Sequence, residues 1–113
     1  MNIIEAVRIC LITKYFNFDD RGSRAEYWLF FLAIYAVESV IEVIFAPSLW
    51  VIAVIFLPVF IPQIAVTARR LHDIGRSGWD QLWFLSIVGI PVVIWWLITP
   101  SDPGENRYGE QPK

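Results

Sequence analysis

The chain has 113 residues, of which 57% are hydrophobic, 16% aromatic and 18% charged, whereas soluble domains are roughly 45–50% apolar. Its net charge of −2 lacks the basic excess that nucleic-acid binding requires, so we expect no nucleic acid as a partner. With one cysteine and one histidine, the chain has neither an internal disulfide nor a zinc-site pattern, and we expect no cofactor and no metal.

Residues 1–18 predict an amphipathic helix that is too polar to cross a membrane. Apolar side chains recur at helical spacing, and most polar side chains lie elsewhere on the helical wheel. Two arrangements stay open: the helix packs on its own protein, or it lies in the lipid interface. Either arrangement places it at the membrane surface.

Residues 24–46 predict the first membrane-crossing helix. Ser23 and Glu26 form a capping-box pattern, in which a hydroxyl and a carboxylate bind the free amides at a helix start. Pro47 ends this helix and begins a very short turn.

Residues 49–70 predict the second crossing, which begins within a stretch that carries no charge. Pro58 and Pro62 should kink this helix, because each removes a backbone donor and crowds the carbonyl four residues earlier. Gly75 is the expected C-cap.

Residues 80–99 predict a third crossing. After its first residue the stretch carries no charge, and as a helix at about 1.5 Å per residue it could cross a hydrocarbon core of roughly 30 Å. Gly89 and Pro91 are expected bend points, and a re-entrant path that returns the tail to the starting side is the alternative. Residues 100–113 are rich in turn-forming residues and predict a surface tail.

Basic residues gather at one end of the predicted crossings, where we count Arg8, Lys14, Arg21, Arg24, Arg69, Arg70 and Arg76. The positive-inside rule therefore predicts a cytoplasmic N-terminus and an external C-terminus. Tryptophans fall close to the predicted helix ends, as interfacial indole rings do. Trp28, Trp79 and Trp83 are assigned to the cytoplasmic end, and Trp50, Trp95 and Trp96 to the other.

The densest polar cluster follows the second crossing and consists of Arg69, Arg70, His72, Asp73 and Arg76. A spacing of four predicts that Arg69 pairs with Asp73 on one helix face. In one interpretation these residues only set the topology and neutralise each other. In the other they bind lipid headgroups or a phosphorylated ligand, because guanidinium groups match phosphate oxygens.

Arg21 and Arg24 belong to the same predicted layer. Either arginine is expected to reach toward Asp73 or Asp80 and to link the first crossing to the loop after the second. His72 is a conceivable general base, but the sequence places no nucleophile or paired carboxylate beside it, so we predict no catalytic residue.

A polar stripe interrupts the first crossing and consists of Tyr35, Glu38, Ser39 and Glu42. An acidic residue at the bilayer centre costs about 2.5–3.5 kcal/mol on insertion scales, so this stripe should face protein or water. We expect Glu38 to be neutral and hydrogen-bonded inside the bundle, with Gln63 as the candidate partner, while Glu42 reaches the outer surface. The alternative is a proton or cation path in an oligomer.

Four motifs lie at residues 16–18, 21–28, 69–79 and 104–109. Together they resemble the domain of unknown function 805 family, small bacterial inner-membrane proteins of the YhaH-like type. The resemblance covers nearly the whole chain. It implies a location in the bacterial inner (plasma) membrane and no established activity.

We therefore predict one all-α membrane domain, with an N-terminal amphipathic helix followed by three transmembrane helices. The leading hypothesis is a non-enzymatic protein that acts through membrane lipids or protein partners, including further copies of itself. The alternative is an oligomeric transporter or channel subunit that uses Glu38 and Glu42.

Overall fold

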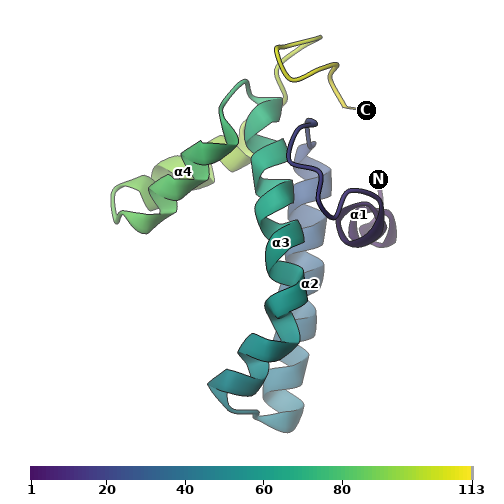
Figure 1. Cartoon of the computed structure of the whole chain (residues 1–113), viewed down its shortest axis with the longest axis vertical. Coiled ribbons are helices and arrows are strands. Elements are labelled where there is room, and N and C mark those ends of the chain that lie inside the picture. Colours follow the sequence, from purple (N-terminus) through teal and green to yellow (C-terminus); the bar gives the residue numbers. More distant parts are fainter. Residues whose placement is uncertain (113) are drawn as a thin grey trace.

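The computed structural model describes residues 1–112, and within them every helix or strand element is helical. In chain order these are α1 (Ile3–Arg8), the π-helical η1 (Ile9–Thr13), α2 (Arg24–Phe45), α3 (Leu49–Asp73), the 3-10 helical η2 (Gly78–Leu85) and α4 (Gly89–Ile98). α2 and α3 form a long pair, and α1 and α4 lie on opposite sides of its upper part (Figure 1). The all-helical prediction is confirmed, and α2 and α3 are long and apolar enough to cross a membrane.

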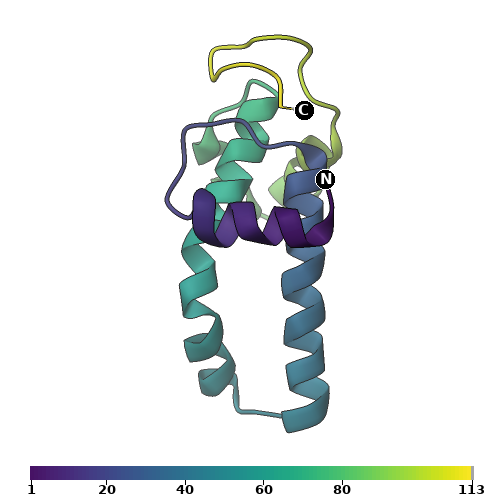
Figure 2. The same ribbon diagram turned by 90° about the vertical axis from the view of Figure 1, so that its right-hand side faces the viewer.

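Serine caps begin both long helices. Ser23 Oγ accepts a hydrogen bond from the Glu26 amide at 3.1 Å, so the predicted start of the first crossing is confirmed. Ser48 caps α3 in the same way. α2 ends at Phe45 with Ala46 as its C-cap, and the short connection through Pro47 turns the chain back to form an antiparallel pair (Figure 2).

α3 continues as one helix through Pro58 and Pro62. Because proline has no amide hydrogen, Pro62 leaves the Pro58 carbonyl without its helical donor. The Tyr15 hydroxyl donates a hydrogen bond to that carbonyl. The N-terminal segment thus satisfies a backbone group that an apolar environment would otherwise leave unpaired.

α1 and η1 run across the antiparallel pair (Figure 2). The Asn2 side chain caps α1. Ala6 and Cys10 are fully buried, whereas Ile4 and Ile12 are 68% and 75% exposed. Packing on its own protein is therefore confirmed for this segment, and the exposed isoleucines leave an apolar edge.

The segment predicted as a third crossing is not a single helix. It divides into η2, of 8 residues, and α4, of 10 residues, and ten helical residues span only about 15 Å. Ser86 Oγ accepts from the Gly89 amide at 3.0 Å, and a Cβ at residue 89 would lie 2.0 Å from the Trp83 carbonyl oxygen. This tight turn sends the chain back toward α3 (Figure 1). The prediction of one helix over 80–99 is therefore wrong.

A glycine ends α3 as predicted. Gly75 has a φ of +78°, a value that favours glycine. Its amide binds the His72 carbonyl at 3.0 Å, and the Arg76 amide binds the Leu71 carbonyl at 2.9 Å. This pair of hydrogen bonds is the Schellman motif, so the predicted C-cap is confirmed.

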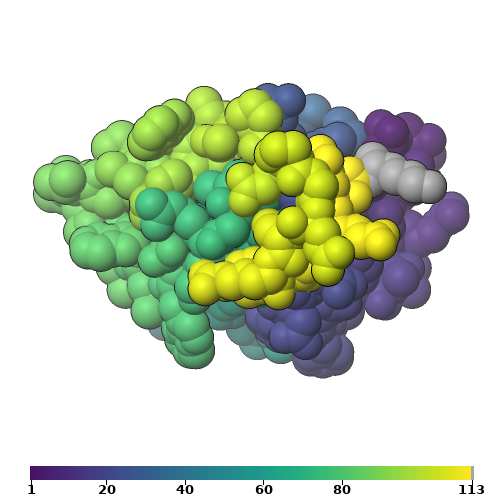
Figure 3. Space-filling view, turned by 90° about the horizontal axis from the view of Figure 1, so that it is seen from above, coloured from purple at the N-terminus to yellow at the C-terminus, as the bar shows by residue number. Residues whose placement is uncertain are grey.

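The tail after α4 lies at the end of the molecule where α2 begins and α3 ends, which we call the polar end. The Asp102 amide donates to the Asp73 carbonyl at 3.0 Å. Figure 3 shows the tail, in yellow, covering this end. The prediction that a third crossing carries the tail to the opposite end is therefore wrong, because η2 and α4 leave the polar end and return to it.

The hydrophobic core lies near the polar end, where it consists of Cys10, Tyr27, Phe30, Val66, Leu71, Val93 and Leu97. Toward the turn between α2 and α3 the hairpin has almost no protein cover, and Val43 and Trp50 are 84% and 81% exposed. A contiguous apolar surface of this kind requires a lipid or protein environment.

Candidate functional site

Arg21 is the centre of a buried polar network at the polar end. Its Nε and Nη2 atoms lie 3.0 and 2.9 Å from Asp73 Oδ1. Nη1 donates to the carbonyls of Gly104 and Gly109 at 2.7 and 3.1 Å, and Nη2 donates to the Asp102 carbonyl at 2.7 Å. One guanidinium therefore joins the start of α2, the end of α3 and the tail.

Asp73 is fully buried and also receives Arg70, whose Nη1 lies 2.8 Å from Asp73 Oδ2. The Ser101 hydroxyl donates to the same carboxylate oxygen. Arg70 Nε donates to the Leu97 carbonyl at 3.0 Å, and its Nη2 donates to the Thr99 carbonyl. This second arginine thus fastens the end of α4 to α3.

Arg69 makes a separate pair on the other side of α3. Its Nη2 lies 2.9 Å from Glu26 Oε1 and 3.7 Å from Cys10 Sγ. Its Nη1 donates to the carbonyls of Lys14 and Asn17 at 3.1 and 2.9 Å. Arg69 therefore holds the N-terminal segment against α2 and α3.

Part of the predicted pairing is wrong. Arg69 does not pair with Asp73, because Asp73 binds Arg21 and Arg70 whereas Arg69 binds Glu26. The predicted link from Arg21 to Asp73 is confirmed. Arg24 is exposed and donates to the Ile98 carbonyl at 3.3 Å, and Asp80 pairs with Arg76 at 3.4 Å.

The exposure of each arginine side chain at the polar end determines whether it can bind a ligand from outside the protein. Arg69 and Arg70 are 0% exposed and Arg21 is 4% exposed, and their guanidinium groups bind carboxylates and backbone carbonyls of the protein itself. Buried charges are tolerated only when paired and hydrogen-bonded in this way. In residues 1–112, Arg69 Nε is the one buried side-chain nitrogen or oxygen without a hydrogen-bond partner. These residues therefore build the site and do not offer their charge to an external phosphate.

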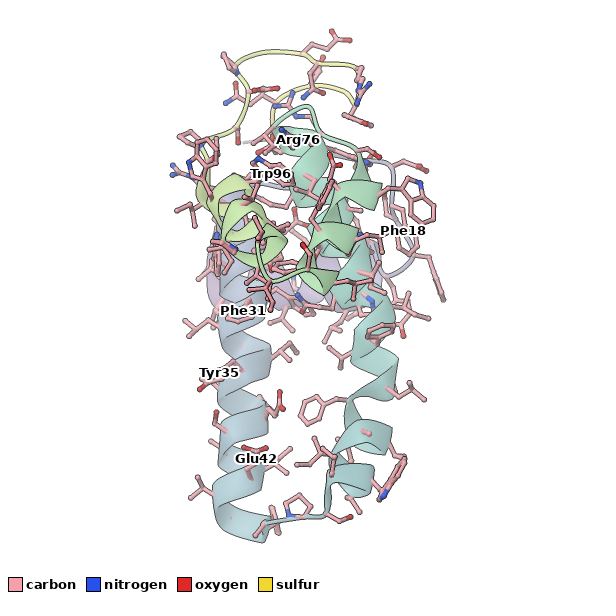
Figure 4. All side chains as sticks on the ribbon, turned by 90° about the vertical axis from the view of Figure 1, so that its left-hand side faces the viewer. Phe18, Phe31, Tyr35, Glu42, Arg76 and Trp96 are labelled. Atoms are coloured by element: carbon pink, nitrogen blue, oxygen red, sulfur yellow. The ribbon has the colours of Figure 1, made fainter. Side chains whose placement is uncertain are left out.

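Arg76 remains at the surface. Its guanidinium lies 3.8 Å from the centre of the Trp96 ring, a cation–π contact that Figure 4 shows near the top of the molecule. The sequence assigned Trp96 to the opposite end. That assignment is wrong for the same reason as the third crossing: α4 returns to the polar end.

A hollow between the loop after η1, the start of η2 and the tail forms what we call the polar-face cavity. Its volume is about 710 Å³. It is lined by Phe18, Asp19, Asp20, Ile64, Ala68, His72, Ser77, Gly78, Trp79, Gln81, Arg107 and Tyr108. Polar groups and apolar surface thus meet in one space.

His72 joins two walls of the polar-face cavity. Its ring stacks on the Tyr108 ring, with centroids 3.8 Å apart and planes 3° apart. Nδ1 lies 3.2 and 3.1 Å from the carbonyl oxygens of Asp19 and Asp20, and since carbonyls only accept, Nδ1 carries a hydrogen. The ring is thereby fixed in orientation.

Sequence reasoning missed most of this cavity. Trp79, Arg107 and Tyr108 belong to motifs that the sequence shows, but the predicted third crossing separated the tail from the loop after η1. Of the predicted binding residues, only His72 lines the cavity.

The polar stripe of α2 is only partly sheltered. Tyr35 is 62% exposed and Glu42 is also exposed, whereas Glu38 and Ser39 are half-buried. Glu38 and Tyr35 line a second hollow of about 310 Å³, which we call the hairpin cavity, together with Phe31, Ile34, Phe56, Val59, Phe60 and Gln63. The predicted neighbourhood of Glu38 and Gln63 is confirmed. Within residues 1–112 the Glu38 side chain forms no hydrogen bond, so the predicted bond to Gln63 is not present.

Two long apolar helices, a third apolar segment folded back on them and a polar end tied by buried arginines define a small helical membrane protein. The family model described as "Protein of unknown function (DUF805)" matches residues 15–110, and the chain belongs to this family.

Two relatives from Escherichia coli strain K12 align along almost their whole length. The chain is 36% identical over 110 residues to inner membrane protein YhaI, with 93% of each chain covered. It is 34% identical over 112 residues to inner membrane protein YhaH, with 91% of this chain and 93% of the relative covered. No solved structure matches.

Proposed function

We propose that this protein is an integral protein of the bacterial inner membrane that binds a lipid headgroup in the polar-face cavity and catalyses no reaction. The observation that carries the proposal is the composition of the cavity. Its wall combines charged groups, such as Asp19 and Arg107, with apolar surface from Phe18, Ile64 and Trp79. A headgroup joined to acyl chains presents the same two chemistries.

The position of the cavity along α3 supports a lipid. Ile64 and His72 line it two helical turns apart, which corresponds to about 12 Å along the helix. His72 lies at the polar end, and Ile64 lies on the way into the apolar part of the hairpin. A ligand in the cavity would therefore extend from the aqueous surface toward the hydrocarbon.

We propose a topology in which only α2 and α3 cross the membrane. η2 and α4 would enter the near leaflet and return, because the turn at Ser86 and Gly89 reverses the chain and the tail after α4 is bonded to Asp73 at the polar end. The basic residues at the polar end favour the cytoplasm for that end. Both termini would then be cytoplasmic.

A binding role fits the surroundings of His72 better than catalysis. Its Nδ1 is occupied by backbone carbonyls and its face by Tyr108, so the ring acts as a rigid part of the wall. The cavity lining offers no nucleophile paired with a base at hydrogen-bond distance among the described residues.

Native mass spectrometry of the protein released from lipid nanodiscs tests the proposal. We expect the parent to retain one phospholipid and Asp19→Trp, which fills the cavity mouth, to lose it. Glu105→Trp is the matched control, because it removes the same charge and adds the same indole at an exposed tail position outside the cavity. Equal retention by the two variants, or no retained lipid in the parent, would contradict the proposal.

The second candidate is an oligomeric transporter or channel subunit. The hairpin cavity favours it, because Glu38 and Gln63 line an opening between the two proposed crossings. Two helices enclose no pathway, so transport would need several copies. A monomer in the same nanodisc spectra would rule this candidate out.

A further inference from the structure

Opposite charges face the polar-face cavity from two different segments. Asp19 and Asp20 come from the loop that precedes α2, and Arg107 comes from the tail. All three side chains are exposed to solvent. The buried arginine network contributes no charge to this lining, so these groups decide which ligand charge the cavity accepts.

The acidic wall is held in a defined shape. Asn17 Oδ1 accepts from the amides of Asp19 and Asp20 at 3.0 and 3.1 Å, and Asn17 Nδ2 donates to Asp20 Oδ2 at 2.9 Å. Lys14 Nζ lies 3.3 Å from the same oxygen. Desolvation is the largest single effect on Asp20 and acts to raise its pKa, but the hydrogen bonds from Asn17 and Lys14, with the nearby charges of Lys14 and Arg69, together outweigh it and lower the pKa of this carboxyl.

Asp19 differs from Asp20 in its partners. Within residues 1–112 the Asp19 carboxylate takes part in no ion pair or hydrogen bond, while its backbone is fixed by Asn17 and His72. The backbone of Asp19 is therefore held in place, while its carboxylate oxygens remain free acceptors. A carboxylate in this state suits a ligand ammonium, which supplies donors and the opposite charge.

Arg107, which forms the basic wall of the cavity, is also available to bind a ligand. Arg107 lies over the Tyr108 ring at 4.9 Å, and its Nη2 donates to the Gly75 carbonyl at the long distance of 3.4 Å. Its remaining donors have no partner within residues 1–112. Since Tyr108 is itself stacked on His72, the guanidinium is anchored at the cavity while its charge remains free for a phosphate.

We propose that the polar-face cavity takes a zwitterionic headgroup that carries a primary ammonium and a phosphodiester, the chemistry of an ethanolamine phospholipid. The ammonium binds Asp19, the phosphate binds Arg107, and the acyl chains pass Ile64. This inference rests on the lipid-binding function proposed above and names the ligand class for that site.

The charge balance separates this headgroup from other phospholipids. Lys14 already pairs with Asp20, so a purely anionic headgroup would meet the Arg107 guanidinium together with the unpaired Asp19 carboxylate, and repulsion from Asp19 would oppose it. A trimethylated ammonium keeps its charge but has no hydrogen to donate to Asp19. Aromatic surface from Phe18 and Trp79 lies in the same lining and favours either ammonium, so the Asp19 carboxylate supplies the selectivity.

Competition among lipids in nanodiscs tests the inference. The probe is an equimolar mixture of phosphatidylethanolamine, phosphatidylglycerol and phosphatidylcholine, with retained lipids identified by native mass spectrometry. We expect the parent to retain phosphatidylethanolamine at least about tenfold over phosphatidylcholine, as a charge-assisted hydrogen bond allows. Preferential retention of phosphatidylglycerol would overturn the inference but leave lipid binding intact, whereas no retained lipid would overturn both.

Two variants test separately the proposed roles of the Asp19 carboxylate and the Arg107 guanidinium. Asp19→Asn keeps the shape and should remove the preference for phosphatidylethanolamine over phosphatidylcholine. Arg107→Gln should weaken retention of both lipids equally, because both carry the phosphate. Glu105→Gln is the control and should change neither. If Asp19→Asn keeps the full preference, the proposed role of the carboxylate is wrong.

Soluble glycerophosphoethanolamine separates a lipid from a free headgroup compound. We expect it to displace the retained lipid only in large excess, because it lacks the acyl chains that pass Ile64. Displacement at concentrations equal to the lipid would show that the chains contribute nothing and would overturn the lipid part of the inference.

Discussion

Arg21 and Asp73 form an ion pair of 2.9 Å between side chains that are 2% and 0% exposed, although 52 residues separate them in the chain. The same guanidinium binds three carbonyls of the tail. Its five donors point in a fixed planar arrangement, which a lysine ammonium does not reproduce. The pair therefore fixes the relative positions of α2, α3 and the tail.

Removing one partner of this pair should destabilise the protein strongly. We expect Asp73→Asn to lower the free energy of unfolding by about 3–5 kcal/mol, because it leaves the buried charges of Arg21 and Arg70 without their carboxylate. Asp80→Asn, which breaks the partly exposed pair with Arg76, should cost at most about 1 kcal/mol. Thermal unfolding of both variants in detergent measures the difference, and equal losses would contradict the role given to Asp73.

Arg21→Lys should release the tail even where the fold survives. The lysine retains a charge for Asp73 but cannot also bind the carbonyls of Gly104 and Gly109. Limited proteolysis should therefore cut residues 102–110 faster in this variant than in the parent. An unchanged cleavage rate would show that other contacts hold the tail.

The C-terminus should lie on the same side of the membrane as the N-terminus. The tail is bonded to Asp73 at the end of α3, and η2 and α4 return to that end. A fluorescent protein fused to the C-terminus should fluoresce in the cytoplasm, whereas alkaline phosphatase fused there should be inactive. Phosphatase inserted in the turn at Pro47 is the control and should be active. An active C-terminal phosphatase would contradict the proposed topology.

Local signals in the sequence predicted the local structure well. Ser23, Pro47 and Gly75 act through neighbours within a few residues, and the structure uses them for a helix start, a turn and a helix end. The prediction of one helix over residues 80–99 failed because the apolar composition of this segment suits both a crossing helix and a folded-back pair of helices. The turn at Ser86 and Gly89 and the hydrogen bonds from Arg70 to the end of α4 favour the folded-back pair.

The site was harder to predict than the fold because its contacts are distant in the sequence. A spacing of four residues predicted an ion pair between Arg69 and Asp73. In the structure Arg69 instead forms its ion pair with Glu26, which is distant in the sequence. The polar-face cavity requires the tail and the loop after η1 to meet, and a pattern along one helix carries no information about that. Because the sequence analysis assigned the tail to the opposite end of the molecule, it gave no reason to place Arg107 and Tyr108 beside His72.

Cys10 should resist alkylation in the folded protein. Burial, followed by the nearby charge of Glu26, raises the pKa of its thiol to about 12, although Arg69 opposes the shift. At pH 8 only about one thiol in ten thousand is then the reactive thiolate. The thiol is also fully buried.

Maleimide labelling in nanodiscs at pH 8 measures this protection. The control is the double variant Cys10→Ala with Thr13→Cys, which places the thiol at an exposed position of the same segment. We expect the control to react at least about a hundredfold faster, and Cys10 to react only after denaturation. Similar rates for the two proteins would show that η1 leaves its packed position readily.

Glu38 should tolerate loss of its charge but not its reversal. The residue lies about 21 Å along α2 from Arg24, half-buried beside Gln63 in the hairpin cavity. We expect Glu38→Gln to leave unfolding unchanged within about 0.5 kcal/mol, because the amide has a similar shape and hydrogen-bonding capacity. Glu38→Lys should reduce insertion into the membrane, since a lysine near the middle of a crossing helix costs about 2.5–3.5 kcal/mol.

Glu42→Lys is the matched control, because Glu42 is exposed and lies one turn nearer the end of α2, so a long side chain can reach the surface. The amounts of each variant in the membrane fraction and their thermal unfolding give the comparison. Similar losses for the two lysine variants would contradict the central position given to Glu38. Proton flux in liposomes completes the test: a flux in the parent that Glu38→Gln abolishes, with the fold intact, would favour the transporter candidate over a purely structural carboxyl.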